Sequence, residues 1–405
     1  MSSSLSSGSR PLVTTSSLLC LPAVLTRLIV AVLLVAGATV VGAGPAAGRT
    51  LGCGEVITVD TTLDGDLVDC PDGGLVIGAD DITLDLNGHT IDGDGISPVS
   101  CPVEGQTCDV GVDNSAGYTG VTIQGGSIQQ FNAGVLVSGG ADANLLSRLT
   151  ISQTTSEAID VGDSANTVIQ GNTMTDPGIA AVVVLESSDA VVSGNSASGS
   201  IEEAFIIGGT GTTVRRNVIA DSAGGIVVID EASGIRVEGN DLRNVGDGVI
   251  VGVASDTLVR HNVVNAVDGG ERGGFGVLLD GAVRSTVDQN LVHTTGVGPA
   301  IYVAQLDAPS APRDNRITRN HVTSQHADGV LVDPDATGTL LSGNVAVNSG
   351  DDGIDVEAPG TTLTGNVAAH NHDLGIEAVP GVVDGGGNHA WGNGNPAQCT
   401  NISCS

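Results

Sequence analysis

The chain of 405 residues contains no lysine, so arginine supplies all 14 basic side chains, against 46 acidic ones. The formal net charge at pH 7 is −32. Nucleic-acid binding requires basic side chains that neutralise phosphates, so nucleic acid is excluded as an expected partner. The same negative field repels anionic glycans unless a cation bridges the two. A neutral polysaccharide, or a glycan contact mediated by Ca²⁺, is the more favourable expectation.

Aromatic residues are also scarce, with three Phe, two Tyr and one Trp in the whole chain. A globular core of ordinary composition is difficult to build from so few large side chains. Sixty glycines accompany abundant Val, Ile, Leu and Ala, a composition that suits many thin apolar layers. Short β-branched segments separated by Gly, Asp, Ser or Asn turns recur along the chain, and no helical period competes with them.

An asparagine recurs at intervals of about 22 residues, with two longer intervals of about 28 and 30 residues. An aliphatic residue lies three positions before each asparagine except the last, and an aliphatic residue, Met or Ala lies two positions after each. In stacked parallel coils, equivalent residues are about 4.8 Å apart, so both positions predict continuous interior ridges. The asparagines are Asn172, Asn195, Asn217, Asn240, Asn262, Asn290, Asn320, Asn344, Asn366 and Asn388.

The asparagine column itself has a structural explanation. Asn tolerates a left-handed bend at a sharp turn, and its amide can bond to the amide of the next coil. The prediction is an all-β, single-stranded parallel β-helix of about thirteen coils of roughly 22–24 residues, with two strands in each interval. Val259 is expected inside a layer, whereas Thr257 is expected to tolerate replacement.

The amino-terminal residues 1–47 have the pattern of a signal peptide. Arg10 and Arg27 precede the apolar run Leu28–Val41, and small residues follow up to Ala47. The run is shorter than the ~20 residues of a spanning helix, which favours cleavage, a secreted protein and no membrane attachment afterwards. The alternative is an uncleaved segment that anchors the protein to a membrane.

Six cysteines remain beyond the Cys20 of this leader, an even number that an exported protein is expected to pair. Proximity predicts three local bridges, and the alternative is free buried thiols. We expect residues 48–80 to form an N-terminal cap, 81–383 the β-helix and 384–405 a C-terminal cap that includes Trp391. The predicted bridges are Cys53–Cys70, Cys101–Cys108 and Cys399–Cys404.

Three sequence features resemble one known group of proteins. The stretch CGEVITVDTTLDGDLVDC, the later LDLNGHTIDGDG and the Gly-Asn repeats resemble bacterial secreted right-handed parallel β-helix repeat proteins with the pectate-lyase-like fold. The resemblance covers Cys53 to Cys404 and implies the fold and its handedness. It does not imply one activity, because that superfamily includes lyases, hydrolases, epimerases, phage tailspikes and proteins without known chemistry.

Motifs for particular activities within this superfamily are incomplete. The segment Ser349–Ile354 resembles the paired-Asp segment of polygalacturonase-like hydrolases, but their Gly-His-Gly and Arg-x-Lys segments have no counterpart. The Asp-Pro-His-Asp motif of mannuronan epimerases is reduced to Asp333-Pro334-Asp335. Pectate-lyase-like enzymes use a basic side chain, often Arg. In this chain, arginines and acidic residues instead alternate at one position of four successive coils. This pattern predicts a surface ladder of salt bridges that consists of Arg215, Glu238, Arg260 and Asp288.

The best candidate site comes from stacking the coils that begin at Asn320, Asn344 and Asn366. Carboxylates packed this closely bind a cation or raise one another's pKa. The alternative is that Asp residues before Gly only form turns. The shared positions are His326, Gly350 and His372; Ala327, Asp351 and Asp373; Asp328, Asp352 and Leu374; and Asp355 with Glu377. We assign Asp351, Asp352, Asp355, His372 and Asp373 as catalytic candidates, and Asp351, Asp352, Asp355 and Asp373 as candidate Ca²⁺ ligands.

Two coils carry extra residues, near 268–273 and near 307–316. The first insertion precedes a strand and the second follows one, so they are expected to wall opposite sides of one strand face. The alternative is a pair of tolerated surface loops. A groove there would be a sugar platform. The candidate substrate contacts are Tyr302, Gln305, His326, Asp328 and Glu377.

The function predicted from these features is that of a secreted β-helix protein that interacts with an extracellular or cell-wall polysaccharide. It would bind the glycan, or cleave it as a lyase or hydrolase. No cofactor is required, and Ca²⁺ is the candidate ion. The alternative is a non-catalytic structural or adhesive solenoid on the cell surface.

Overall fold

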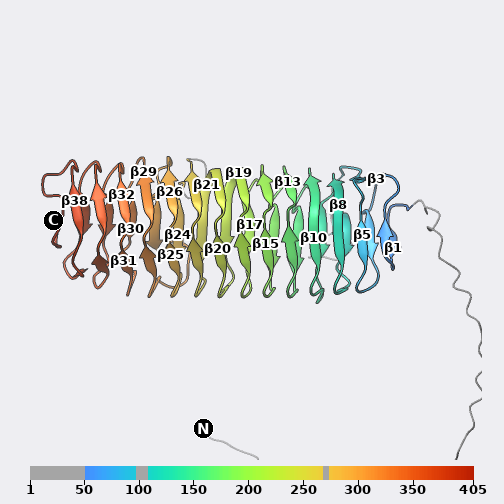
Figure 1. Ribbon diagram of the computed structural model, residues 1–405, viewed down its shortest axis with the longest axis horizontal. Helices are drawn as coiled ribbons and strands as arrows, with labels where there is room; N and C mark the ends of the chain where they lie inside the picture. The colour runs from blue at the N-terminus through green and yellow to red at the C-terminus, as the bar shows by residue number, and fades with distance from the viewer. Residues whose placement is uncertain (1–50, 97–107, 268–272) are drawn as a thin grey trace, which may run out of the picture. The chain divides into compact units, whose positions relative to one another are not determined.

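The structure is a computed structural model that describes residues 51–96, 108–267 and 273–405. Across these residues the secondary structure consists of 38 β-strands, without any helix. All of the strand pairings between successive coils are parallel, from β1 at one end of the stack to β38 at the other (Figure 1). The predicted all-β parallel solenoid is therefore confirmed. It has about fourteen turns, one more than expected.

The coils stack so that their strands form three parallel ladders, which we call ladders A, B and C. Strands β8 (Thr122–Gln129) and β10 (Leu145–Ser152) run through ladders B and C, and β19 (Val218–Val228) and β21 (Asp241–Gly252) run through C and A. The other strands of ladder A are β1 (Glu55–Ile57), β4 (Leu75–Ile77), β7 (Val110–Asn114), β9 (Ala133–Val137), β11 (Ile159–Gly162), β14 (Val182–Leu185), β17 (Glu203–Ile207), β24 (Val277–Asp280), β27 (Ile301–Ala304), β30 (Val330–Val332), β33 (Ile354–Val356) and β36 (Ile376–Ala378).

Ladders B and C complete each coil, so a regular coil contains three strands rather than the expected two. Ladder B also contains β2 (Thr61–Thr62), β5 (Thr83–Asp85), β12 (Val168–Gln170), β15 (Val191–Ser193), β18 (Thr213–Arg215), β20 (Arg236–Glu238), β22 (Leu258–Arg260), β25 (Thr286–Asp288), β28 (Arg316–Thr318), β31 (Leu340–Ser342), β34 (Thr362–Thr364) and β37 (Val383–Asp384). Ladder C also contains β3 (Leu67–Cys70), β6 (Thr90–Gly93), β13 (Thr173–Thr175), β16 (Ser196–Ser198), β23 (Val263–Ala266), β26 (Leu291–Thr294), β29 (His321–Ser324), β32 (Val345–Val347), β35 (Val367–Ala369) and β38 (His389–Trp391).

The two predicted aliphatic columns lie inside the coils. Val259 in β22 and Val264 in β23 are 0 and 1% exposed, and their counterparts in neighbouring coils are buried as well. Each fully buried Val or Leu side chain contributes roughly 1.5–3 kcal/mol of transfer free energy. The expectation for Thr257 is wrong, because this residue is 1% exposed. It lies at the turn from ladder A to ladder B, where Thr side chains point inward as the aliphatic ones do.

The asparagines form the expected ladder but do not make the left-handed bend. Asn217 donates from Nδ2 to Asn240 Oδ1 at 2.9 Å and to the Val192 carbonyl at 3.0 Å. Its own Oδ1 accepts the backbone N–H of Asn195. The left-handed residue is the one immediately before each Asn, such as Arg216 with a φ of 54°. The amide ladder therefore satisfies buried polar groups, while the preceding residue turns the chain.

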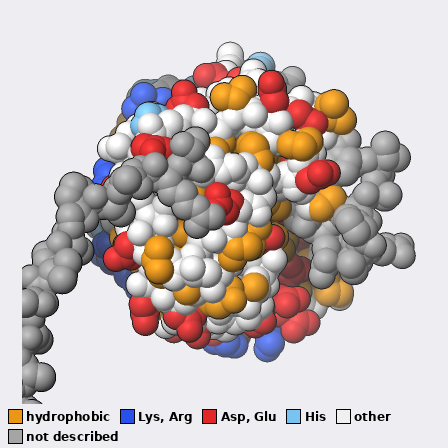
Figure 2. Space-filling model, turned by 90° about the vertical axis from the view of Figure 1, so that its right-hand side faces the viewer, with side chains coloured by type: hydrophobic (Ala, Val, Ile, Leu, Met, Phe, Trp, Pro, Cys, Tyr) orange, Lys and Arg blue, Asp and Glu red, His pale blue; other side chains and the backbone are white. Residues whose placement is uncertain are grey.

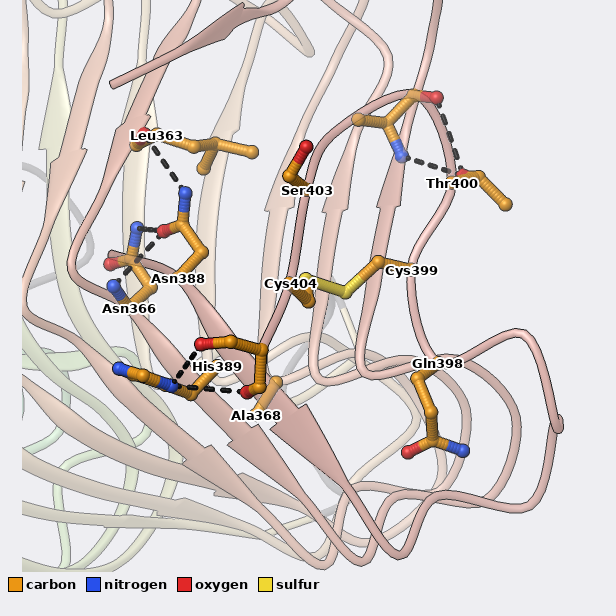
Figure 3. Close-up of a disulfide and its surroundings, with 12 residues drawn as sticks. Leu363, Asn366, Ala368, Asn388, His389, Gln398, Cys399, Thr400, Ser403 and Cys404 are labelled. Carbon is orange, nitrogen blue, oxygen red and sulfur yellow. Dashed lines mark hydrogen bonds between the residues drawn. A yellow bond between two sulfur atoms is a disulfide. The ribbon is translucent and has the colours of Figure 1, made fainter. Parts of the chain in front are cut away.

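Both ends of the described solenoid carry a predicted disulfide, Cys53–Cys70 and Cys399–Cys404. The second closes the last turn beside the end of the asparagine ladder at Asn366 and Asn388 (Figure 3). Cys108 is also disulfide-bonded, and its predicted partner Cys101 lies outside the described residues.

The strands of both predicted caps pair with neighbouring coils. Residues of the expected N-terminal cap form the first coil, with strands β1, β2 and β3 that pair with the next coil. Val56 and Val68 are 55 and 62% exposed on this coil, and Figure 2 views this end of the molecule with its apolar side chains. At the other end Trp391 of β38 is 50% exposed.

The predicted signal segment 1–47 lies outside the described residues. Within the part that the structure does describe, we find no helix with the length and apolar character needed to span a membrane.

Candidate functional site

The predicted acidic register forms at the turns that lead into ladder A. Asp328 precedes β30, Asp352 precedes β33 and Leu374 precedes β36. The N–H of Asp352 donates to Asp328 Oδ1 at 2.9 Å, and the N–H of Leu374 donates to Asp352 Oδ1 at 2.6 Å. Each carboxylate thus accepts a backbone amide of the following coil, a role in turn structure that leaves its second oxygen for other contacts.

A second column lies on the strands themselves. Asp355 of β33 is the direct Cα partner of Glu377 of β36 in the parallel register. Two groups of carboxylates form around these turns and strands, and within each group one oxygen of every member lies within 4.8 Å of the others. The first group is Asp328, Asp351 and Asp352, and the second is Asp352, Asp355 and Glu377. Asp352 belongs to both, and we call the five residues the acidic cluster.

Burial and mutual repulsion hold protons on this cluster near neutral pH. Burial above all, with the hydrogen bond to Glu377 and the charges of Asp328 and Asp351, raises the pKa of Asp352 to about 8, although the backbone hydrogen bond from Leu374 lowers it. Burial and neighbouring carboxylates likewise raise the pKa of Asp355 to about 7. Because a buried carboxylate is costly without a counterion, such groups either keep a proton or take up a cation.

The remaining sequence candidates lie around the cluster. His326 and His372 are exposed in the turns, and neither carboxylate group within the described residues includes a histidine. Asp373 lies outside both groups as well, and its backbone N–H donates to the Asp351 carbonyl at 3.2 Å. Two members of the acidic cluster, Asp328 and Glu377, are predicted substrate contacts. The repeat interval in the sequence predicts the coil positions that these two residues share with other acids. Their closeness to Asp352, however, depends on the direction of the side chains.

Tyr302 shares the strand column of the acidic cluster. It pairs with Leu331, and Leu331 pairs with Asp355, so Tyr302 of β27 lies two coils from Asp355 on one outward column of ladder A. Tyr302 Oη donates to Asp333 Oδ2 at 2.8 Å, and its ring lies 5.4 Å from that of Phe275. Burial and this bond raise the pKa of Tyr302, so its hydroxyl stays protonated.

The two insertions border this same face at opposite ends of the strands. Phe275, at the end of the first insertion, packs with Leu278 and Tyr302 in an apolar cluster outside the coil interior. The second insertion follows β27, and there Gln305 Nε2 donates to the Ala308 carbonyl at 3.1 Å. Gln305 therefore stabilises the conformation of the second insertion. Residues 268–272 of the first insertion lie outside the described residues.

The arginines lie away from ladder A. Arg215, Glu238 and Arg260 occupy one register position on ladder B, as predicted. Arg260 Nε lies 3.2 Å from Glu238 Oε1, while Asp288, next in the column, bonds instead to Arg319 at 2.8 Å. Exposed pairs of this kind contribute at most about 1 kcal/mol each. The described strand residues that pair within ladder A include no arginine, since Arg243 of β21 pairs in the ladder C part of that strand. No basic side chain of ladder A therefore neutralises the acidic cluster.

Comparison with known families identifies the architecture. The family model described as "Right handed beta helix region" matches residues 108–263 and 161–308. The chain is a right-handed β-helix protein.

Several solved structures are similar to this right-handed β-helix. The tailspike protein of Escherichia coli bacteriophage HK620, as a double mutant in complex with pentasaccharide, is 14% identical, with 86% of this chain and 73% of that chain covered and a TM-score of 0.54. The A-module of mannuronan C-5 epimerase AlgE6 from Azotobacter vinelandii is 13% identical, with 89 and 91% covered and a TM-score of 0.46. No curated protein matches the chain by sequence.

Proposed function

We propose that this β-helix protein is exported and interacts with an extracellular or cell-wall polysaccharide along ladder A. The observation that carries the proposal is the single outward column that joins the partly exposed Tyr302 ring to Asp355 and Glu377. An aromatic ring with polar groups in line is a common arrangement for sugar binding, because the ring contacts the C–H face and the polar groups accept hydroxyl protons. Tailspike structures with the same fold carry a pentasaccharide or a hexasaccharide, which supports this choice of ligand class.

The acidic cluster supports either ion binding or catalysis on the bound glycan. With Ca²⁺, the carboxylates of Asp328, Asp351 and Asp352 would supply oxygen ligands of the kind this ion prefers. Without it, a protonated carboxyl can donate its proton to the leaving glycosidic oxygen while an ionised one attacks the anomeric carbon, which gives a glycosyl-enzyme intermediate that water then hydrolyses. The elevated pKa of Asp352 suits the donor, and Asp355 or Glu377, each with an oxygen within 4.8 Å of one of Asp352, suits the nucleophile. We propose Ca²⁺ as the candidate ion.

The test is a glycan-array screen of the exported protein with and without Ca²⁺, followed by calorimetry with the selected glycan. We expect a selected polysaccharide, at least tenfold weaker binding by Tyr302→Ala, and no loss in an Asp64→Asn, Asp72→Asn control that removes two exposed acids of the first coils. New reducing ends would show hydrolysis, and unsaturated products would show a lyase. An array that selects no glycan under either condition would contradict the proposal.

A structural or adhesive role is the second candidate, and one observation favours it. Asp328 and Asp352 each accept an amide of the following coil, so part of the cluster stabilises turns. If Asp352→Asn lowers thermal stability but leaves glycan binding and turnover unchanged, the cluster serves the turns and not the ligand.

A further inference from the structure

A groove of about 370 Å³ lies on the outer surface of ladder A, several coils before the acidic cluster. The outward side chains of Val227 and Ile250 line its floor, with Ile229 beside them. The same column continues from Ile250 through Leu278 to Tyr302. At about 4.8 Å for each of the four steps from Ile250 to Asp355, the groove lies roughly 19 Å from the cluster along one face.

The second insertion forms a wall of this groove and is held in place by one buried carboxylate. Asp280 is 6% exposed and accepts the backbone N–H groups of Leu306, Asp307 and Ala308 at 2.8, 3.1 and 3.3 Å. The insertion thereby folds back over the coils that precede it, and Ala308 and Pro309 line the groove. Gly281 leaves room for this path, because a Cβ there would lie 2.4 Å from that of Ala308.

Val253 lines the groove in a backbone conformation that its side chain disfavours. Its φ is 51°, in the left-handed region, which is a genuine outlier for a β-branched residue. At the equivalent turn, the preceding coil has Asp230 and the following coil has Gly281, residue types that adopt this conformation more readily. An apolar side chain is thus kept at the groove despite local strain, a combination that is concentrated at ligand sites.

The charge of the groove defines its ligand. Asp230, Glu231, Asp280 and Asp307 are among the lining residues, and no arginine is. Arg284 and Arg313 lie at the turn from ladder A to ladder B but do not line the groove, and the other arginines of the described residues lie on ladders B and C or the turn between them. Figure 2 shows the basic side chains gathered at the left and lower rim. An occupant must combine an apolar face for Val227, Ile250 and Val253 with a cation for the carboxylates around it.

We propose that this groove binds an amino-sugar unit, so that the polysaccharide recognised along ladder A is one with free, protonated amino groups. The C–H face of the sugar ring contacts the apolar floor, and its ammonium group bonds to the carboxylates of Asp230 and Glu231. The inference rests on the proposed glycan function and names its substrate class. A basic peptide offers the same charge, but the groove is continuous with the column that carries Tyr302.

Calorimetry with two matched oligosaccharides tests the proposal on the mature protein. The probes are the β-1,4-linked glucosamine tetramer and its fully N-acetylated counterpart, which has the same backbone without the charge, at a pH where the amine is protonated. We expect the glucosamine tetramer to bind at least tenfold more tightly. An oligolysine of equal charge is the peptide probe, and we expect it to bind more weakly than the tetramer.

Two variants separate the ligand from the fold. Asp230→Asn with Glu231→Gln should weaken binding of the glucosamine tetramer at least tenfold, whereas the Asp64→Asn, Asp72→Asn control removes the same charge and should not. Val253→Gly removes the apolar contact and relieves the left-handed backbone, so binding should weaken while the melting temperature stays or rises. If Val253 has only a structural role, Val253→Gly should lower the melting temperature and leave binding unchanged.

The possible outcomes are distinct. Equal affinity for both tetramers, or tighter binding of oligolysine, would overturn the amino-sugar assignment. If a neutral glycan binds and Tyr302→Ala abolishes that binding while the groove variants do not affect it, the proposed function stands and this inference falls. If neither tetramer nor any array glycan binds, both fall.

Discussion

Asp355 of β33 stands directly beside Glu377 of β36 in the parallel register, and an oxygen of each lies within 4.8 Å of an oxygen of Asp352. Adjacent coils of a β-helix repeat at about 4.8 Å, so any acidic residue that recurs at one coil position meets its own counterpart. On ladder B, the column of Arg215, Glu238, Arg260 and Asp288 avoids the repulsion by alternation in sign. The column of Asp355 and Glu377 does not alternate in this way, and its carboxyl groups resolve the repulsion by protonation or by a cation.

Thermal stability should fall as the pH rises from 5 to 8.5. The folded pKa of Asp352, about 8, lies above its ordinary value of 3.8, so the folded state binds the proton more tightly than the unfolded state. Such a group stabilises the fold fully below the unfolded pKa, and the contribution is lost as the pH approaches the folded pKa. Asp355 and Asp328, with pKa values raised to about 7 and about 6, act in the same direction. Asp352→Asn should flatten a plot of melting temperature against pH; a melting temperature that rises across this window in the parent would contradict the assignment.

Calcium binding should have the reverse pH dependence. The ion needs ionised carboxylates, so we expect measurable calorimetric heat at pH 8 and much weaker binding at pH 5. The double variant Asp352→Asn, Asp355→Asn should abolish the heat, whereas Asp64→Asn with Asp72→Asn should retain it. Absence of heat in the parent at both pH values would leave the cluster as a protonated network without an ion.

Replacement of Val259 by Asp should cost several kcal/mol of unfolding free energy, because it buries a carboxylate in an apolar layer. Leu291→Asp is the matched control. Leu291 is 49% exposed on ladder C, and its neighbours in the register are Val263 and His321 rather than acids. Denaturant unfolding measures both, and similar midpoints for the two variants would disprove the interior column.

At the asparagine turn, the asparagine bonds to the neighbouring coils and the residue before it makes the left-handed bend. Replacement of these two adjacent residues should therefore have different effects on stability. Asn262→Ala leaves the Val237 carbonyl and the Asn240 amide buried without their partner, at a cost of about 1–3 kcal/mol. His261 carries the left-handed bend, with a φ of 55°, so His261→Gly should be nearly neutral. Thermal unfolding of the two variants tests this prediction. A larger loss of stability in His261→Gly than in Asn262→Ala would contradict the assignment of the bend to His261.

Peptide mapping without reduction should recover three bridged pairs from the exported protein. Two are the terminal bridges Cys53–Cys70 and Cys399–Cys404, and the third should join Cys108 to Cys101. A bridge between the first and last coils, such as Cys53–Cys404, would be incompatible with a stack of about fourteen turns, because its ends lie far apart.

The sequence by itself determined the solenoid, its period and most of its interior. The recurring interval between asparagines places Val259 and its counterparts in one column, and the same interval places Asp328 with Asp352 and Asp355 with Glu377. These relationships are readable because a parallel stack converts a sequence offset directly into a distance of one coil.

Only the tertiary structure decided what the repeat does not encode. Side-chain direction selects Asp328, Asp352 and Glu377 for the acidic cluster and leaves Asp373 outside it. Burial at the turn from ladder A to ladder B places Thr257 inside. The path of the second insertion depends on a single carboxylate, Asp280, whose bonds to three backbone amides fold the loop over earlier coils and form the groove. An inserted loop has no periodic neighbour, so its position follows from non-local contacts that no interval in the sequence records.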